Sequence, residues 1–146
     1  MKRGTIIIGL LLIPFLVCNC IAPKTFKKGS DPAWQQIILK PALPYDVAWN
    51  ILIDALTEKY IIEVSDKESG YIKTGWCYTT TGVEKKHYKC RVIVRFRPNK
   101  RSLQVKTECE FQTFWDWVFK NKWSLGTDSR ATEDVYLDLK SKVGQK

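Results

Sequence analysis

The sequence predicts an α+β fold, a two-layer sandwich in which two helices cover one face of an antiparallel sheet. Two amphipathic patterns with a helical period, one early in the domain and one at its end, account for the helices. Alternating apolar and polar residues mark the strands between them, and short turns join these strands as antiparallel neighbours require. The expected order is strand, helix, four strands and helix.

The N-terminus has the layout of a bacterial lipoprotein signal. Two basic residues open the chain after Met1, an apolar run covers residues 6–17, and Cys20 follows. The run is too short to cross a hydrocarbon core of ~30 Å as a helix. We therefore expect a signal peptide over residues 1–19 and a lipid on Cys20. The imperfect lipobox leaves open a lipid on Cys18, an ordinary secretory signal or a single membrane anchor.

The rest of the chain predicts a tether and one domain. Residues 20–32 contain three Lys, two Pro and one Gly and predict a lipidated N-terminus with a linker, whereas residues 33–146 contain no second linker. The chain is basic, with 24 Lys and Arg against 15 Asp and Glu and a formal net charge of +9. This charge suits an anionic membrane surface or an acidic partner. It would also suit nucleic acid, but export argues against nucleic acid as the partner.

The domain is expected to begin with a strand over residues 34–39, and a helix follows. Asp46 lies in the first turn of that helix, where its carboxylate interacts favourably with the helix dipole. Residues 60–64 and 71–78 then predict a hairpin whose polar turn ends in Gly70. The apolar face expected for the helix consists of Val47, Ala48, Ile51, Leu52, Ala55 and Leu56.

Alternation assigns the two faces of the second strand of this hairpin. Ile72, Thr74 and Trp76 form its more apolar side and are expected to point into the core. Cys77 is then expected on the opposite face, away from the core.

A tight turn joins the next two strands, residues 87–97 and 102–111. If the turn is centred between Asn99 and Lys100, residues at equal distances from this point are directly opposed. One face then carries opposite charges in register and is expected to be exposed, while the other face carries apolar pairs and is expected to be buried. The expected pairs are Lys89 with Glu110, Arg91 with Glu108, Val94 with Val105, Phe96 with Leu103 and Cys90 with Cys109.

The densest aromatic region covers residues 114–123. These rings could pack together and close one end of the core, as most large aromatic side chains do. Alternatively they form an exposed surface for a partner or for the lipid interface. A basic side of the sheet, with Lys73, Arg91 and Arg95, is a second candidate surface, unless it is only a solvated face. The residues expected to form the aromatic surface are Trp115, Trp117, Phe119, Lys120, Lys122 and Trp123.

The last helix is expected to begin at Asp128 or Ser129, because either side chain can cap the first amides. It is expected to end at Gly144. Its apolar residues recur at four-residue steps and are Ala131, Val135, Leu139 and Val143.

Three cysteines remain once Cys20 is assigned to the lipid, namely Cys77, Cys90 and Cys109. Their spacing lacks the close Cys-x-x-Cys pair of a zinc site, so we predict no metal. Direct opposition on neighbouring strands favours a disulfide between Cys90 and Cys109, and an oxidising compartment permits it. Buried free cysteines are the alternative.

The sequence gives little support to catalysis. His87 is the only histidine, and it shares a strand face with Lys89 and Arg91, which indicates a solvated position rather than a general base. A Gly-rich phosphate loop, a nucleophile elbow and a carboxylate pair in an apolar setting are all absent from the sequence. We therefore predict no catalytic residue and no cofactor.

Several of these motifs occur together in one known family. A helix beginning with residues 45–49 precedes an aspartate-to-glycine turn at 66–70, then isoleucine, threonine and tryptophan at alternate positions of 72–76, and an Arg-rich strand over 91–96. This arrangement resembles one helix-grip domain of the BamC (NlpB) lipoproteins, over about residues 34–143. The resemblance implies a helix-grip-like fold and an accessory, non-catalytic lipoprotein on the periplasmic side of the outer membrane that assists assembly of β-barrel proteins.

These observations favour a lipid-anchored protein of the cell envelope with one domain that acts by binding. Its lipid would attach it to the membrane, and an envelope protein would be its partner. A structural envelope lipoprotein without a dedicated partner is the first alternative. An exported enzyme of an unfamiliar type is the second.

Overall fold

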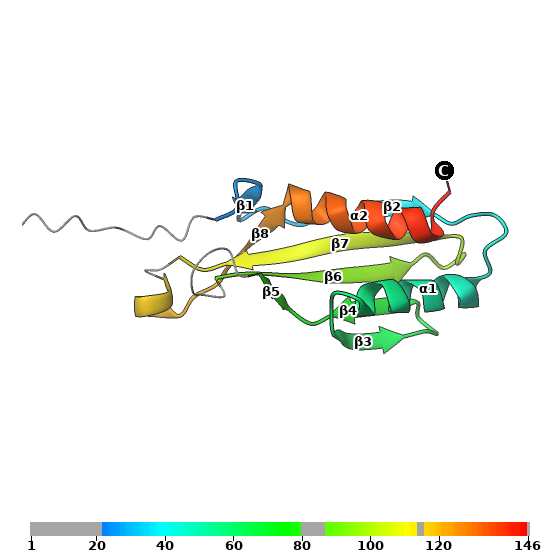
Figure 1. The fold of residues 1–146 in the computed structure, drawn as a ribbon, viewed down its shortest axis with the longest axis horizontal. Coiled ribbons are helices and arrows are strands. Elements are labelled where there is room, and N and C mark those ends of the chain that lie inside the picture. The colour runs from blue at the N-terminus through cyan, green and yellow to red at the C-terminus, as the bar shows by residue number, and fades with distance from the viewer. Residues whose placement is uncertain (1–21, 80–86, 114–115, 146) are drawn as a thin grey trace, which may run out of the picture.

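Figure 1 shows the computed structural model, which describes residues 22–79, 87–113 and 116–145. The elements follow one another as β1 (Phe26–Lys28), β2 (Gln35–Ile38), α1 (Tyr45–Thr57), β3 (Ile62–Asp66), β4 (Tyr71–Thr74), β5 (Cys77–Thr79), β6 (Tyr88–Phe96), β7 (Ser102–Phe111), the π-helical turn η1 (Asp116–Lys120), β8 (Ser124–Asp128) and α2 (Ser129–Val143).

The strands form one antiparallel sheet. Hydrogen bonds order them as β1-β8-β7-β6-β4-β3, with β2 also paired to β7 and β5 also paired to β6. Both helices pack on the same face of this sheet and share one core (Figure 1). The predicted two-layer α+β sandwich is therefore confirmed, with β1 and β8 in addition to the expected strands.

The main core lies between the sheet and the two helices. Phe96 of β6 stands at one end of this core, where its ring centroid lies 4.9 Å from that of Tyr45 and 6.0 Å from that of Trp49. Aliphatic side chains from every layer fill the rest and are almost completely buried; they include Ile37, Leu52, Leu56, Ile72, Val92, Val94, Leu103, Val105, Leu139 and Val143.

The predicted apolar face of α1 is confirmed at Ala48, Leu52, Ala55 and Leu56, but it differs at two positions. Trp49 is buried, whereas Val47, expected in the core, is 44% exposed. The large Trp49 ring packs against Phe96 and gains more from burial than a valine would, so the helix presents Trp49 to the sheet. Asp46 forms an ion pair with Lys67, with 2.8 Å between Oδ1 and Nζ.

The second helix begins and ends as the sequence predicts. Asp128 is its N-cap, and its Oδ1 accepts hydrogen bonds from the backbone amides of Arg130 and Ala131. Gly144 is the C-cap, and its amide donates to the Lys140 carbonyl. The cap supplies acceptors to amides that have no partner within the helix.

The register predicted for the long hairpin of β6 and β7 is confirmed at all of the expected pairs. The apolar pairs of Val94 and Phe96 are buried, as expected. The charged pairs lie on the opposite face, but the expectation that they are exposed is wrong. Lys89 is only 8% exposed and Glu108 only 9%, because aromatic and charged neighbours cover them.

The strand predicted over residues 71–78 is interrupted by a β-bulge. Lys73 pairs with Ile93, but Cys77 pairs with Cys90, so the outer strand has one residue more than β6 over this stretch. The amide of Gly75 points away from β6 and donates to the carbonyl of Ile61, next to β3, at 2.8 Å. Because of the extra residue, the side chains of residues 76–79 point to the face opposite the one that strict alternation predicts.

The bulge corrects two predictions of side-chain direction. Ile72 and Thr74 precede it and are buried in the core, as expected. Trp76 follows it and lies over Lys89 and Arg91 on the opposite face, not in the core. Cys77, predicted on that opposite face, shares the core face with its register partner Cys90.

The tether predicted over residues 20–32 is shorter, because part of it joins the sheet. β1 pairs with β8, and the Phe26 ring centroid lies 6.1 Å from that of Tyr88 and 5.9 Å from that of Phe111. The predicted signal peptide and Cys20 lie outside the described residues. Across the described ranges, none of the helices has the length and apolar character needed to cross a membrane.

Candidate binding surface

The face of the sheet opposite α1 and α2, here called the charged face, gathers cations, carboxylates and aromatic rings. Alternation along β6 and β7 directs these side chains away from the core, since Val92, Val94 and Val105 point into it. The residues of β6 and β7 on this face are Lys89, Arg91, Ile93, Arg95, Gln104, Lys106, Glu108 and Glu110.

Lys89 is held between two indole rings and a carboxylate. Its Nζ lies 4.6 Å from the centroid of the Trp76 ring, 4.1 Å from that of Trp123 and 2.9 Å from Glu110 Oε2. Its side chain is only 10% exposed. A cation over an indole is stabilised by ~0.5–1 kcal/mol at the surface and by ~2 kcal/mol when water is excluded. Because Lys89 is so little exposed, we expect its contact with the rings to contribute about 2 kcal/mol, the value for a cation shielded from water.

Glu108 connects two further cations. Its Oε2 accepts hydrogen bonds from Arg91 Nε at 2.8 Å and pairs with Nη2 at 2.7 Å, and its Oε1 pairs with Lys106 Nζ at 2.6 Å. Burial would raise the pKa of the Glu108 carboxyl, but hydrogen bonds and charges from Lys106 and Arg91 lower it below its ordinary value. The carboxylate therefore stays ionised at neutral pH and fixes both cations.

The array extends to Trp34 at its other end. The Trp34 ring lies 5.0 Å from Lys106 Nζ and 5.5 Å from Arg95 Cζ, and Arg91 Cζ lies 4.4 Å from the Trp76 ring. The contacts thus form one continuous chain across the sheet. We call it the aromatic-cation ladder, and its members are Trp123, Lys89, Trp76, Arg91, Glu108, Lys106, Trp34 and Arg95.

The surface predicted from the aromatic run is only partly described. Trp115 and the side chain of Trp117 lie outside the described residues. Phe119 is 68% exposed on η1, and Lys120 and Lys122 beside it are also exposed. Trp123 is half-buried and belongs to the ladder, where its ring also meets Tyr78 edge-on with 6.2 Å between centroids.

Two of the three rings of the ladder, Trp34 and Trp76, do not appear in the aromatic surface predicted from the sequence. Trp34 is distant in sequence from the cations that it covers, so no local pattern indicates the contact. Trp76 could have been found, because Gly75 stands alone inside a strand pattern, which is a signal for a bulge and a change of face.

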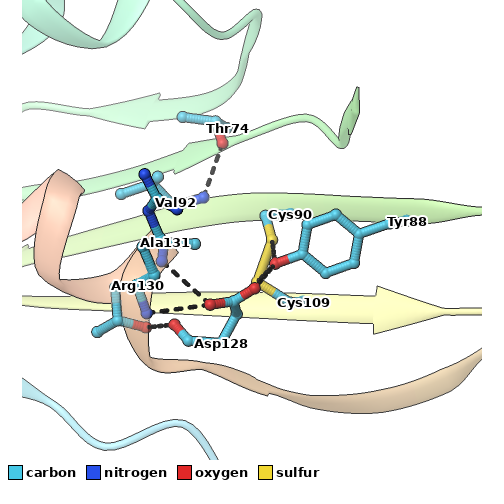
Figure 2. Close-up of a disulfide and its surroundings, with 9 residues drawn as sticks. Thr74, Tyr88, Cys90, Val92, Cys109, Asp128, Arg130 and Ala131 are labelled. Atoms are coloured by element: carbon cyan, nitrogen blue, oxygen red, sulfur yellow. Dashed lines mark hydrogen bonds between the residues drawn. A yellow bond between two sulfur atoms is a disulfide. The ribbon is translucent and has the colours of Figure 1, made fainter. Parts of the chain in front are cut away.

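On the core face, a second cluster surrounds a disulfide. Cys90 and Cys109 are joined, with 4.1 Å between their Cα atoms, as the opposed register favours (Figure 2). Tyr88 Oη lies 3.1 Å from Cys90 Sγ and donates a hydrogen bond to Asp128 Oδ2 at 2.5 Å. Tyr88 therefore links the disulfide to the N-cap of α2.

Both titratable groups of this cluster have altered pKa values. Burial, followed by the hydrogen bond to Asp128 and its negative charge, raises the pKa of the Tyr88 phenol far above its ordinary value. Burial would raise the pKa of Asp128, but hydrogen bonds from Tyr88, Thr25 and the helix amides lower it. The phenol is thus the proton donor and the carboxylate the acceptor.

His87 is 5% exposed, so the solvated position expected for it is wrong. It directly precedes β6, and its carbonyl accepts a hydrogen bond from the Gln112 amide at 2.8 Å. Among the residues that the structure describes, no three or more His, Cys, Asp and Glu side chains are grouped so that they could hold a metal ion.

Comparison with known proteins does not assign a function, so the function is inferred from the side chains of this chain. No protein-family model matches this chain, and no curated protein matches it. The ladder is then the arrangement with the clearest chemical capacity. It presents indole rings beside the guanidinium groups of Arg91 and Arg95, and Trp and Arg are the residue types enriched where protein surfaces bind one another.

Proposed function

We propose that this protein is a non-catalytic, lipid-anchored binding module of the bacterial envelope, and that the aromatic-cation ladder receives its partner. The resemblance to the BamC lipoproteins extends the proposal to an accessory role in outer-membrane protein assembly, on the periplasmic side of that membrane. The fixed positions of Trp34, Trp76 and Trp123 carry the proposal. Rings that are ordered before binding lose little conformational freedom when a partner covers them.

The charge of the ladder indicates the kind of partner. Glu108 and Glu110 compensate part of its positive charge, and no ion pair of Arg95 is found among the described residues. Arg95 lies at the Trp34 end, so this end combines an indole with an available guanidinium. An envelope protein with an acidic patch beside apolar side chains would complement it.

A photo-reactive phenylalanine analogue in place of Tyr78, which is 45% exposed beside the ladder, is expected to form a discrete adduct with a partner in membranes. Adding Trp34→Ala is expected to lower the adduct yield ~5-fold or more, since truncating an important interface residue costs more than ~1 kcal/mol of binding free energy. The measurement is immunoblotting of irradiated cells, with the adduct identified by mass spectrometry.

The matched control places the analogue at Leu137, which is 53% exposed on α2. The same adduct from Leu137, or none from Tyr78, would contradict a partner surface on the charged face. Absence of an adduct from both positions would favour the structural envelope lipoprotein. Circular dichroism should show that Trp34→Ala leaves the fold intact, because Trp34 is 37% exposed.

The anchor has its own test. Cys20→Ala is expected to abolish labelling with a radioactive or clickable fatty acid and to release the protein from the membrane fraction, because the acyl chains provide most of the attachment. Cys18→Ala is the matched control and should retain both properties. Loss of labelling with Cys18→Ala alone would move the lipid to Cys18, and loss with neither would overturn the lipoprotein assignment.

A further inference from the structure

The three cysteines of the described domain lie in one row across three neighbouring strands. Cys77 of β5 is directly opposite Cys90 of β6, and Cys90 is directly opposite Cys109 of β7. Directly opposed residues of antiparallel strands project from the same face. All three side chains therefore lie on the core face, with Cys90 in the middle.

The spacing on the two sides of Cys90 permits a disulfide with either neighbour. Its Cα lies 4.1 Å from that of Cys109, which identifies this as the closer, non-hydrogen-bonded type of pair. The backbone groups of Cys90 then point toward β5, so Cys77 and Cys90 form the wider type of pair, with Cα atoms ~5.5 Å apart. This separation is typical of disulfides.

An independent contact supports this backbone direction. The amide of Val92, two residues along β6, donates to Thr74 Oγ1 at 2.9 Å and so points to the same side as β5 (Figure 2). Residues two apart on a strand direct their backbone groups to the same side. The backbone of Cys90 is thus directed at Cys77.

Access differs sharply among the three sulfurs. Cys109 is 0% exposed and Cys90 is 7% exposed, whereas Cys77 is half-buried and carries a free thiol. Cys77 also lines a pocket of about 410 Å³, with Tyr60, Trp76 and the end of α1 among its other walls. Of the three, Cys77 is the one that water and small thiols can reach.

We propose that Cys77 is an exchange-competent thiol, so that the disulfide can migrate from Cys90–Cys109 to Cys77–Cys90. The Cys77 thiol loses its proton to water in the pocket, and the thiolate attacks Cys90 Sγ. A Cys77–Cys90 bond forms as the Cys90–Cys109 bond breaks, and the electron pair leaves with Cys109. Cys109 then takes up one proton, so the exchange consumes no oxidant or reductant.

The order of the row suits this displacement. Cys77 and Cys109 flank the central sulfur from opposite strands, so the attacking and leaving atoms lie on opposite sides of it. Tyr88 Oη, whose proton is donated to Asp128 Oδ2, lies 3.4 Å from Cys109 Sγ, so a polar group borders the departing sulfur. Migration would transfer the covalent link from the pair β6 and β7 to the short strand β5, which directly follows Trp76 of the ladder.

The test uses the full lipidated chain in detergent and needs no substitution for its main arm. The protein is incubated at pH 8.5, unfolded under acid conditions that stop exchange, and its free thiol is blocked with a maleimide before peptide mapping. Label at Cys109 is expected to rise with incubation time. Cys77→Ser is the matched control and should show no label at Cys109, because it lacks the attacking sulfur.

Two more variants test the order of the row in a glutathione buffer that contains the oxidised form. Cys109→Ser is expected to form a Cys77–Cys90 disulfide, whereas Cys90→Ser should leave Cys77 and Cys109 unlinked, since two strand spacings, ~9.6 Å, separate them. Wild-type protein labelled only at Cys77 at all times would overturn the proposal. A Cys77–Cys109 link in folded Cys90→Ser protein, or free Cys77 and Cys90 in folded Cys109→Ser protein, would overturn it as well.

Discussion

Replacing Phe96 with Ala is expected to lower the free energy of unfolding by about 3–5 kcal/mol, because a large ring leaves the core and a cavity remains. Phe96 is 4% exposed, and its ring packs against those of Tyr45 and Trp49. Typical domains unfold with only ~5–15 kcal/mol, so this loss would be a large part of the total stability. Urea denaturation followed by far-ultraviolet circular dichroism measures the change.

The control for Phe96→Ala is Val47→Ala in α1. The sequence pattern assigns Val47 to the core, but the structure exposes 44% of it, so the loss should stay within about 0.5 kcal/mol. A loss below 1 kcal/mol for Phe96→Ala would contradict the core described above. A loss comparable with that of Phe96→Ala for Val47→Ala would instead support the helix orientation predicted from the sequence.

The hairpin of β6 and β7 was the most predictable part of the fold because two independent patterns agree there. Apolar residues alternate along both strands, and charges of opposite sign face one another in the same register. A slip by one residue would place Arg91 opposite Thr107 or Cys109 and so pair a charged side chain with an uncharged one, which the pattern excludes. The α2 cap was equally predictable, because an aspartate directly before a helical pattern satisfies the first amides.

The errors occur where a single residue changes the phase or where elements are too short to carry a pattern. The bulge after Thr74 reverses the faces of Trp76 and Cys77, although strict alternation would assign them the other way. β1 has three residues and β8 reads Ser-Leu-Gly-Thr-Asp, so neither shows the apolar alternation of a strand. Their pairing depends on contacts between distant segments, such as Phe26 with Tyr88 and Phe111.

In the candidate site, too, sequence patterns within one hairpin were predictive, whereas contacts between distant segments were missed. The charged residues of the ladder were placed on the correct face, since β6 and β7 alone determine their direction. The rings that cover them come from other elements, and Trp34 and Trp76 reach the face through the pairing of β2 and through the bulge. Sequence alone therefore predicted an exposed charged face, either solvated or open to a partner, where the structure has an ordered array of rings and ions.

Replacing Asp128 with Ala is expected to lower the free energy of unfolding by about 2–4 kcal/mol. The variant loses the N-cap of α2, worth ~0.5–2 kcal/mol, and leaves the buried Tyr88 hydroxyl without its acceptor, which costs about 1–3 kcal/mol. Asp128 is 3% exposed, so water cannot readily replace these contacts. Thermal and urea denaturation measure the loss.

The pH dependence separates the charge of Asp128 from its role as a cap. Because its folded pKa lies below the ordinary value of 3.8, the ionised carboxylate contributes stability that is fully present above pH ~4 and is lost as the pH falls toward the folded pKa. Asp128→Asn keeps a capping oxygen but does not titrate, so its stability should fall less steeply with acid than that of the wild type. Tyr88→Phe is the second control. It removes one donor from the Asp128 carboxylate, so its stability should fall with acid less steeply than that of the wild type but more steeply than that of Asp128→Asn. If the stability of wild type and Asp128→Asn falls equally with acid, the charge of Asp128 does not stabilise the N-terminus of α2.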